Sequence, residues 1–228
     1  MDAGVNKIRL EVAGRSLLTW ALRAFEACVG IRELVVVCQP VDRLALEHIA
    51  AKAVRKTVRF VDGGERRQDS SLAGVQAARG EIVLVHDSAR PFPSVDLIER
   101  VIAATELHGA AVPALPVVDT VRYQDENGLL IPGDVSRHRL MRMQTPQGFI
   151  RSHLLSALSS GVEATDDAGS ILAAGRPVAV VDGEETNIKV TTPKDLLQAQ
   201  QILSHRANRI SELSADDTRN IAGSTGER

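Results

Sequence analysis

The sequence is short of several features that would assign it to a specialised class. It has only two cysteines, Cys28 and Cys38, which cannot form a disulfide framework and suit a reduced, cytoplasmic setting. No uninterrupted apolar run approaches the roughly 20 residues that span a bilayer, and the N-terminus has no signal-peptide pattern. The formal net charge is −2, so the overall field favours neither nucleic acid nor membrane, and any anion site must be local. There is no metal-binding Cys/His cluster, and no G-x-G-x-x-G follows a strand, which argues against a dehydrogenase.

The stretch around residues 82–91 organises the rest of the chain. Ile82 to Val85 form a continuous apolar run typical of a buried strand in a parallel sheet. Asp87 and Arg90 follow directly, at the carboxyl end of that strand, where open α/β sheets bind ligands. An acid and a guanidinium at this position suit a metal ion and phosphate oxygens. The plainer interpretation is a structural ion pair at the end of a strand.

Strand and helix patterns alternate along most of the chain. This alternation predicts an α/β fold with a mostly parallel sheet and helices on both faces. Strands are predicted at 34–38, 58–61, 82–85, 110–115 and 178–181, with a short extended piece at 10–12 and another at 187–190. Helices are predicted at 17–28, 44–53, 71–78, 95–108, 150–158, 167–174 and 192–203.

The alternation is interrupted at about 118–140. Residues 120–123 and 129–131 flank Asn127-Gly128, and Asn-Gly is a strong signal for a tight hairpin turn. We expect a β-arm inserted into one domain that covers residues 1–205. Residues 206–228 are polar and predicted to be a disordered tail.

Two further features point to a polar cleft. The Gly63–Ser70 loop precedes a helix, so its backbone N–H groups could meet a phosphate or a base edge, although Gly-Gly pairs are more often simple turns. Lys189 stands between Ile188 and Val190 in an extended apolar segment. A lysine in such a place is unusual unless its side chain enters a polar cleft.

Six ordered motifs together carry a resemblance to a known family. The motifs are VDGGERRQDS (61–70), LVHDSARP (84–91), PVVDTV (116–121), SRHRLMRMQTPQGF (136–149), TDDA (165–168) and NIKVTTPKDL (187–196). In order and approximate spacing, the sequence resembles the 2-C-methyl-D-erythritol 4-phosphate cytidylyltransferase family of isoprenoid biosynthesis. The resemblance implies a three-layer, Rossmann-like nucleotidyltransferase fold and a homodimer joined through the arm.

The resemblance also implies the reaction. The family transfers CMP from CTP to a sugar-alcohol phosphate and releases pyrophosphate, with Mg²⁺ or another divalent cation held mainly by the CTP phosphates. Such a transfer needs positioning and charge stabilisation rather than a covalent intermediate. Ribitol 5-phosphate cytidylyltransferases share most of the motifs, so ribitol 5-phosphate is an alternative acceptor.

The family's functional residues map onto matching positions of this sequence. Lys7 and Lys189 would contact the α-phosphate and stabilise the transition state. Gly64 and Ser70 would line the cytosine pocket. Asp87 and Arg90 would hold the acceptor and the polar network on the nucleotide side. Thr120 and Arg137 would bind the acceptor phosphate in the partner subunit's site. Asp166 and Asp167 are expected to be structural.

The start of the chain departs from the family pattern. The family begins with a strand and a phosphate-wrapping loop of the form Ala-Ala-Gly-x-Gly-x-Arg-Met, and Met1 stands where that loop ends. We expect an internal Met assigned as the start, a truncated chain, or a decayed paralogue that serves as a dimerisation or nucleotide-binding module. Without the loop, the 228-residue chain is expected to turn over CTP poorly.

Overall fold

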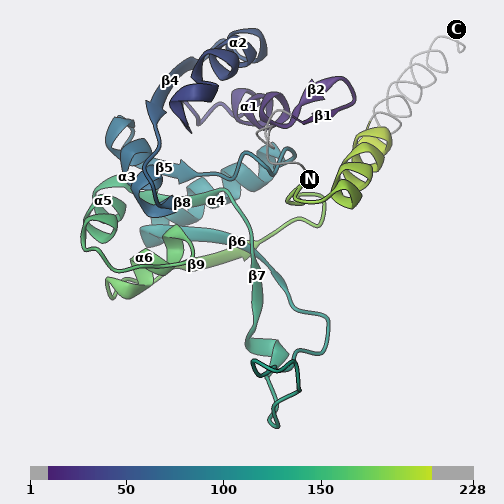
Figure 1. Cartoon of the computed structure of the whole chain (residues 1–228). Helices are drawn as coiled ribbons and strands as arrows, with labels where there is room; N and C mark the ends of the chain where they lie inside the picture. Colours follow the sequence, from purple (N-terminus) through teal and green to yellow (C-terminus); the bar gives the residue numbers. More distant parts are fainter. Residues whose placement is uncertain (1–9, 207–228) are drawn as a thin grey trace, which may run out of the picture.

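The predicted alternation of strands and helices is confirmed by the computed structural model, which describes residues 10–206 (Figure 1). The strands are β1 (Glu11–Val12), β2 (Arg15–Ser16), β3 (Glu33–Cys38), β4 (Thr57–Asp62), β5 (Ile82–Val85), β6 (Ala110–Pro116), β7 (Met141–Met143), β8 (Gln147–Ile150) and β9 (Ala179–Asp182). The α-helices are α1 (Leu17–Ala27), α2 (Arg43–Ala53), α3 (Arg67–Ala77), α4 (Val95–His108), α5 (Arg151–Ser159), α6 (Asp167–Ala173) and a last helix at 193–206. Lys7 and most of the predicted tail lie outside the described residues.

The strands of the α/β alternation run in a common direction within their sheets. Strands β3 and β4 are a parallel pair. In the larger sheet β8 lies between β5 and β6 and is antiparallel to both, so β5 and β6 share a direction, and β9 pairs parallel with β6. The predicted mostly parallel sheet is therefore confirmed, with β7 and β8 as the strands that run the other way.

Helices cover both faces of the sheet, and strand β5 shows how. Successive side chains of a strand point to opposite faces. Val83 packs in a core with Phe149 and Leu154, on the side of α3 and α5, whereas Leu84 packs against Phe25 and Ile98 from α1 and α4. Each face of the strand thus buries apolar area against its own helices, which is the predicted three-layer arrangement.

Strand β8 was not predicted from the sequence, because its residues are determined by packing against neighbouring elements. A Cβ at Gly148 would lie 2.2 Å from Thr105 Oγ1 of α4, so only glycine lets the helix approach the strand this closely.

Helix α3 begins at Arg67, four residues before the predicted Ser71. Its first turn is stabilised by the Asp69 carboxylate, which accepts hydrogen bonds from the Arg66 backbone and guanidinium.

The chain between β6 and β7 projects from the body as an arm (Figure 1). Backbone hydrogen bonds from Ile131 N to Tyr123 O and from Asp125 N to Leu129 O reverse the chain at Asn127-Gly128. The predicted hairpin is thus present at its tip, where one isolated bridge joins Gln124 and Leu130 instead of a ladder. Within residues 10–206, none of the helices has the length and apolar character needed to cross a bilayer.

Candidate active site

Three segments that lie far apart in the sequence meet beyond the end of β5. They are the His86–Arg90 loop, Thr145 just before β8, and the extended segment 187–190. Val190 N donates to Ala89 O at 2.8 Å, which joins the third segment to the first. Asp87 N donates to Thr145 Oγ1 at 3.0 Å, and Asn187 Nδ2 donates to Thr145 O at 2.8 Å. The sheet edge predicted to bind a ligand therefore carries a connected set of polar groups.

Lys189 and Asp87 form the ion pair at the centre of this region. Lys189 Nζ lies 2.7 Å from Asp87 Oδ2, and the two side chains are 46% and 38% exposed. The neighbouring Val190 is buried and Ile188 is partly buried in an apolar cluster. Lys189 is therefore turned towards polar surroundings by its apolar neighbours, as its sequence context predicts.

Arg90 fixes the same region from the other side. Its Nη1 donates to Asn187 O at 2.7 Å and its Nη2 donates to Met143 O at 3.3 Å. Burial lowers the pKa of Arg90, against the opposing effect of the Asp87 charge, but an arginine starts so high that it stays a cation. Among the described residues Asp87 pairs with Lys189, whereas Arg90 donates to carbonyl groups, so the ion pair at this strand end has a different partner from the one its sequence spacing suggests.

The charges of the cluster suit an anionic ligand. Two cations, Lys189 and Arg90, stand beside one carboxylate, Asp87, so the local balance is positive although the chain as a whole is slightly negative. Arg90 Nε and Asn187 Oδ1 are buried and have no hydrogen-bond partner among the described residues. The arrangement can hold and polarise phosphate oxygens.

The predicted cytosine loop is a separate, ordered turn after β4. Gly64 N donates to Ser70 Oγ at 3.1 Å, and Gly63 N donates to Cys38 O of β3 at 2.9 Å. These bonds bring Gly64 and Ser70 together as the sequence suggests. Within residues 10–206, no hydrogen bond or ion pair links this loop to Asp87 or Lys189.

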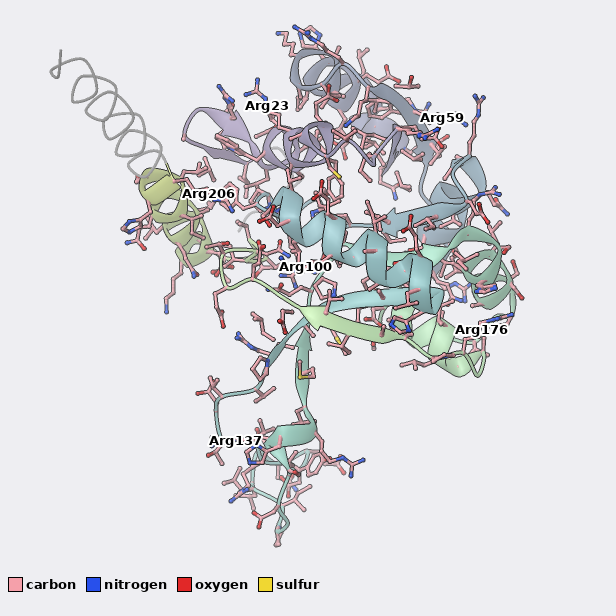
Figure 2. All side chains as sticks on the ribbon, turned by 180° about the vertical axis from the view of Figure 1, so that it is seen from behind. Arg23, Arg59, Arg100, Arg137, Arg176 and Arg206 are labelled. Carbon is pink, nitrogen blue, oxygen red and sulfur yellow. The ribbon has the colours of Figure 1, made fainter. Side chains whose placement is uncertain are left out.

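Thr120 and Arg137 lie on the arm, away from the ion pair. Both residues are exposed, and Arg137 Nη1 donates to Val118 O at 2.7 Å. Figure 2 shows Arg137 on the projecting arm, well removed from the body of the same chain. Among the described residues, no hydrogen bond or ion pair joins Arg137 to Asp87 or Lys189.

Comparison with known proteins decides the family. The family model described as "IspD: 2-C-methyl-D-erythritol 4-phosphate cytidylyltransferase" matches residues 1–205. The chain belongs to this family. The 2-C-methyl-D-erythritol 4-phosphate cytidylyltransferase of Geobacillus kaustophilus is 40% identical over 212 residues, which cover 90% of this chain and 92% of that protein.

Solved structures of cytidylyltransferases share the fold. The enzyme from Thermus thermophilus is 39% identical with a TM-score of 0.71, and the match covers 88% of this chain and 94% of that one. A 4-diphosphocytidyl-2C-methyl-D-erythritol synthase from Anaerococcus prevotii is 29% identical with a TM-score of 0.80, over 89% of this chain and 92% of that one. The Rossmann-like nucleotidyltransferase fold predicted from the sequence is confirmed.

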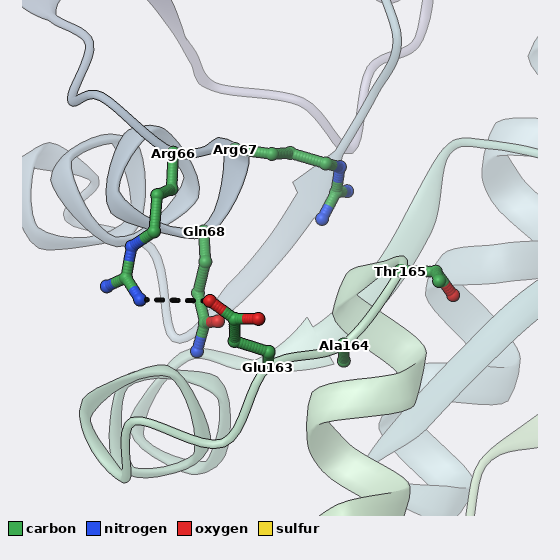
Figure 3. Close-up of a pocket in the computed structure, with 6 residues that line it drawn as sticks. All are labelled: Arg66, Arg67, Gln68, Glu163, Ala164 and Thr165. Carbon is green, nitrogen blue, oxygen red and sulfur yellow. Dashed lines mark hydrogen bonds and ion pairs between the residues drawn. The ribbon is translucent and has the colours of Figure 1, made fainter.

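A cavity of about 320 Å³ lies elsewhere, between the start of α3 and the loop before α6 (Figure 3). Arg66, Arg67, Gln68 and Glu163 line it, and none of the predicted site residues does. Its charges serve the fold, because Arg67 pairs with the buried Asp167. Asp166 accepts from Gly169 N and caps α6, so the structural roles expected for both aspartates agree with these contacts.

Sequence reasoning assigned no role to His86, Thr145 or Asn187. Thr145 belongs to a polar stretch, 144–147, that stands out between two short strands. Asn187 is fully buried, and its carbonyl and amide groups bind Arg90 and Thr145. The available signal was the position of these polar residues at the ends of apolar segments.

Proposed function

We propose that this protein transfers CMP from CTP to 2-C-methyl-D-erythritol 4-phosphate and releases pyrophosphate, the step of non-mevalonate isoprenoid biosynthesis for which its family is named. The observation that carries the proposal is the Asp87–Lys189 pair beside Arg90 at the end of β5. These charges suit a reaction in which negative charge grows on a phosphorus centre.

The transfer is an in-line displacement at the α-phosphorus. An oxygen of the acceptor phosphate forms the new P–O bond, and the bond from the α-phosphorus to the bridging oxygen breaks as pyrophosphate leaves. Lys189 and Lys7 would stabilise the charge on the α-phosphate. Lys189 is held for this by Asp87 at 2.7 Å and is exposed enough to turn from the carboxylate to a bound nucleotide.

The substrate-binding roles are divided among the remaining residues. Gly64 and Ser70 would line the cytosine pocket, in a turn whose backbone is fixed by their mutual hydrogen bond. Asp87 and Arg90 would hold the acceptor and the polar side of the nucleotide. Thr145 fixes the backbone of Asp87, and the Asn187 carbonyl fixes the guanidinium of Arg90, which supports the use of this segment as a rigid platform.

A divalent cation, Mg²⁺ in the simplest case, would act with the nucleotide. Within residues 10–206 there is no group of three or more His, Cys, Asp or Glu side chains able to hold a metal ion. The donor set near Lys189 is two cations and one paired carboxylate, which fits an ion held mainly by triphosphate oxygens. When bound, such an ion would neutralise charge on the leaving pyrophosphate.

The active unit would be a homodimer formed through the arm. Val118, Tyr123, Leu129 and Leu130 on the arm are 64–71% exposed. A two-stranded hairpin is marginal by itself, and a two-fold contact with a second copy would cover these side chains. Arg137 and Thr120 would then reach the acceptor phosphate in the partner subunit's site.

An acceptor panel tests the function. The purified protein is incubated at high concentration with CTP and Mg²⁺, so that slow turnover is still visible, and pyrophosphate and the cytidylyl product are measured. We expect product with 2-C-methyl-D-erythritol 4-phosphate and much less with ribitol 5-phosphate. Product with ribitol 5-phosphate alone would reassign the acceptor. Binding of CTP with no product from either acceptor would indicate a nucleotide-binding module.

A further inference from the structure

The ring of His86 contacts the Asp87–Arg90 loop through one nitrogen and Thr145 through the other. Nε2 is 2.9 Å from Arg90 O, and Nδ1 is 3.0 Å from Thr145 Oγ1. A carbonyl oxygen can only accept, so Nε2 carries the proton and donates it. Burial lowers the pKa of His86 to about 4, so the ring is neutral near pH 7 and Nδ1 accepts a hydrogen bond from the Thr145 hydroxyl.

The Thr145 hydroxyl completes a directed chain of hydrogen bonds. The hydroxyl donates its proton to His86 Nδ1, and its oxygen accepts a hydrogen bond from the backbone N–H of Asp87 at 3.0 Å. The chain thus runs from Asp87 N–H through Thr145 and the His86 ring to Arg90 O, with each donor and acceptor assigned. The chain begins on the backbone of Asp87, whose side chain pairs with Lys189, and ends on the backbone of Arg90, whose side chain binds Asn187.

Two more contacts make this arrangement rigid. Phe25 of α1 packs edge-on against the His86 ring, with centroids 4.9 Å apart and planes at 65°. The Thr145 carbonyl accepts from Asn187, two residues before Lys189, so Thr145 contacts both segments that carry the ion pair. A site on loops is accurate only when a supporting set of contacts fixes it.

We propose that His86 and Thr145 are positioning residues, whose hydrogen bonds hold Asp87 and, through it, Lys189 in the geometry required for nucleotidyl transfer. The inference rests on the proposed function. Neither side chain touches substrate in this account; each acts through the backbone of Asp87 and Arg90.

A matched pair of variants at one position tests the proposal. Thr145→Val keeps the shape but removes the hydroxyl, whereas Thr145→Ser keeps the hydroxyl. Loss of the shared hydroxyl leaves the Asp87 N–H and His86 Nδ1 without partners, which predicts a fall in kcat of about 10- to 100-fold. KM for CTP should change less than about threefold, and Thr145→Ser should keep kcat within about threefold of the parent.

The same substitution is then made in a Lys189→Ala chain. Because Thr145 acts through Lys189, Thr145→Val should reduce kcat much less in that background than in the parent. An equal reduction in both backgrounds, or a Thr145→Ser enzyme as slow as Thr145→Val, overturns the proposal. If Thr145→Val does not fold, His86→Gln, which keeps a group near Nε2 but loses the bond to Thr145, should show the same fall in kcat.

Nitrogen NMR of the histidine rings gives a readout that does not depend on activity. We expect the His86 ring to carry its proton on Nε2 and to remain neutral at pH 6, with its Nδ1 signal shifted by Thr145→Val. A proton on Nδ1, or a signal unmoved by that substitution, contradicts the hydrogen-bond chain. A parent enzyme that transfers CMP to no acceptor, but keeps this NMR pattern, would instead refute the proposed function.

Discussion

Gly64→Ala is the substitution whose consequences the structure specifies most fully. A Cβ at residue 64 would lie 2.3 Å from Asp69 Cβ and 3.4 Å from the Asp69 main chain. Asp69 Cβ belongs to the first turn of α3 and cannot swing aside as the end of a flexible side chain could. The two carbons must separate by more than about 1 Å to reach ordinary van der Waals contact. Because Asp69 accepts hydrogen bonds from Arg66, the shift also disturbs the start of the helix.

Overpacking costs about 1–3 kcal/mol and loss of an N-terminal cap about 0.5–2 kcal/mol, so the free energy of unfolding should fall by about 1.5–5 kcal/mol. The affinity for CTP should fall as well, because Gly64 and Ser70 share the turn proposed to hold cytosine. Urea unfolding and CTP titration measure the two effects. Gly30→Ala is the control, since its Cβ would meet the movable end of Ile102 at 3.3 Å and lie in ordinary contact with Cys28 Sγ at 3.9 Å. A Gly64→Ala protein within about 0.5 kcal/mol of the parent, with unchanged CTP affinity, would refute the reasoning.

Three further predictions concern a helix end, the buried histidine and the arm. The Lys56 ammonium donates hydrogen bonds to Phe25 O, Glu26 O and Cys28 O at the end of α1, and Lys56→Met removes all three. Urea unfolding should show that the free energy of unfolding falls by about 1.5–3 kcal/mol. Lys52 is exposed, so Lys52→Met should leave the free energy of unfolding unchanged. The pKa of His86 is lowered to about 4, so the unfolded chain takes up a proton first as the pH falls below about 6.5. The stability associated with His86 is therefore complete above that pH, and about 2–3 kcal/mol of it should be lost by pH 4.5, a slope that His86→Gln should flatten. Mixing Arg137→Ala chains with Lys189→Ala chains should restore activity after subunit exchange, because one of the two sites in each mixed dimer has both residues intact. If activity is not restored after verified exchange, both residues act in the site of one chain.

The layers of the fold could be predicted because their residues obey simple periodic rules. The runs at β3, β5 and β6 are continuous and apolar, and the Ser16 and Ser94 side chains cap α1 and α4 as their positions suggest. Strand β7 was not predicted because its side chains are all exposed and show no buried face. Strand β8 forms because it pairs with both β5 and β6 and because α4 packs closely against it. Neither contact can be predicted from the local sequence pattern.

The site shows the same division between local and long-range information. Asp87 and Arg90 were identified because they follow a buried strand at the sheet edge where ligands bind, and Lys189 because a lysine within an apolar segment is unusual. The structure brings these three residues together. Thr145 and Asn187 bind partners 42 or more positions away, so the sequence shows them as polar residues at the ends of apolar segments but does not show their partners. The roles of Thr120 and Arg137 remain predictions, because they depend on a second subunit.

Steady-state kinetics of Lys189→Ala test the central claim most directly, with the exposed Lys194→Ala as the matched control. Negative charge on the α-phosphate grows in the transition state, so Lys189 should contribute most there. Lys189→Ala should lower kcat by about 100- to 1,000-fold and change KM for CTP much less, while Lys194→Ala stays close to the parent. A Lys189→Ala enzyme with normal kcat and only a raised KM would contradict the assignment of the Asp87–Lys189 cluster as the catalytic centre.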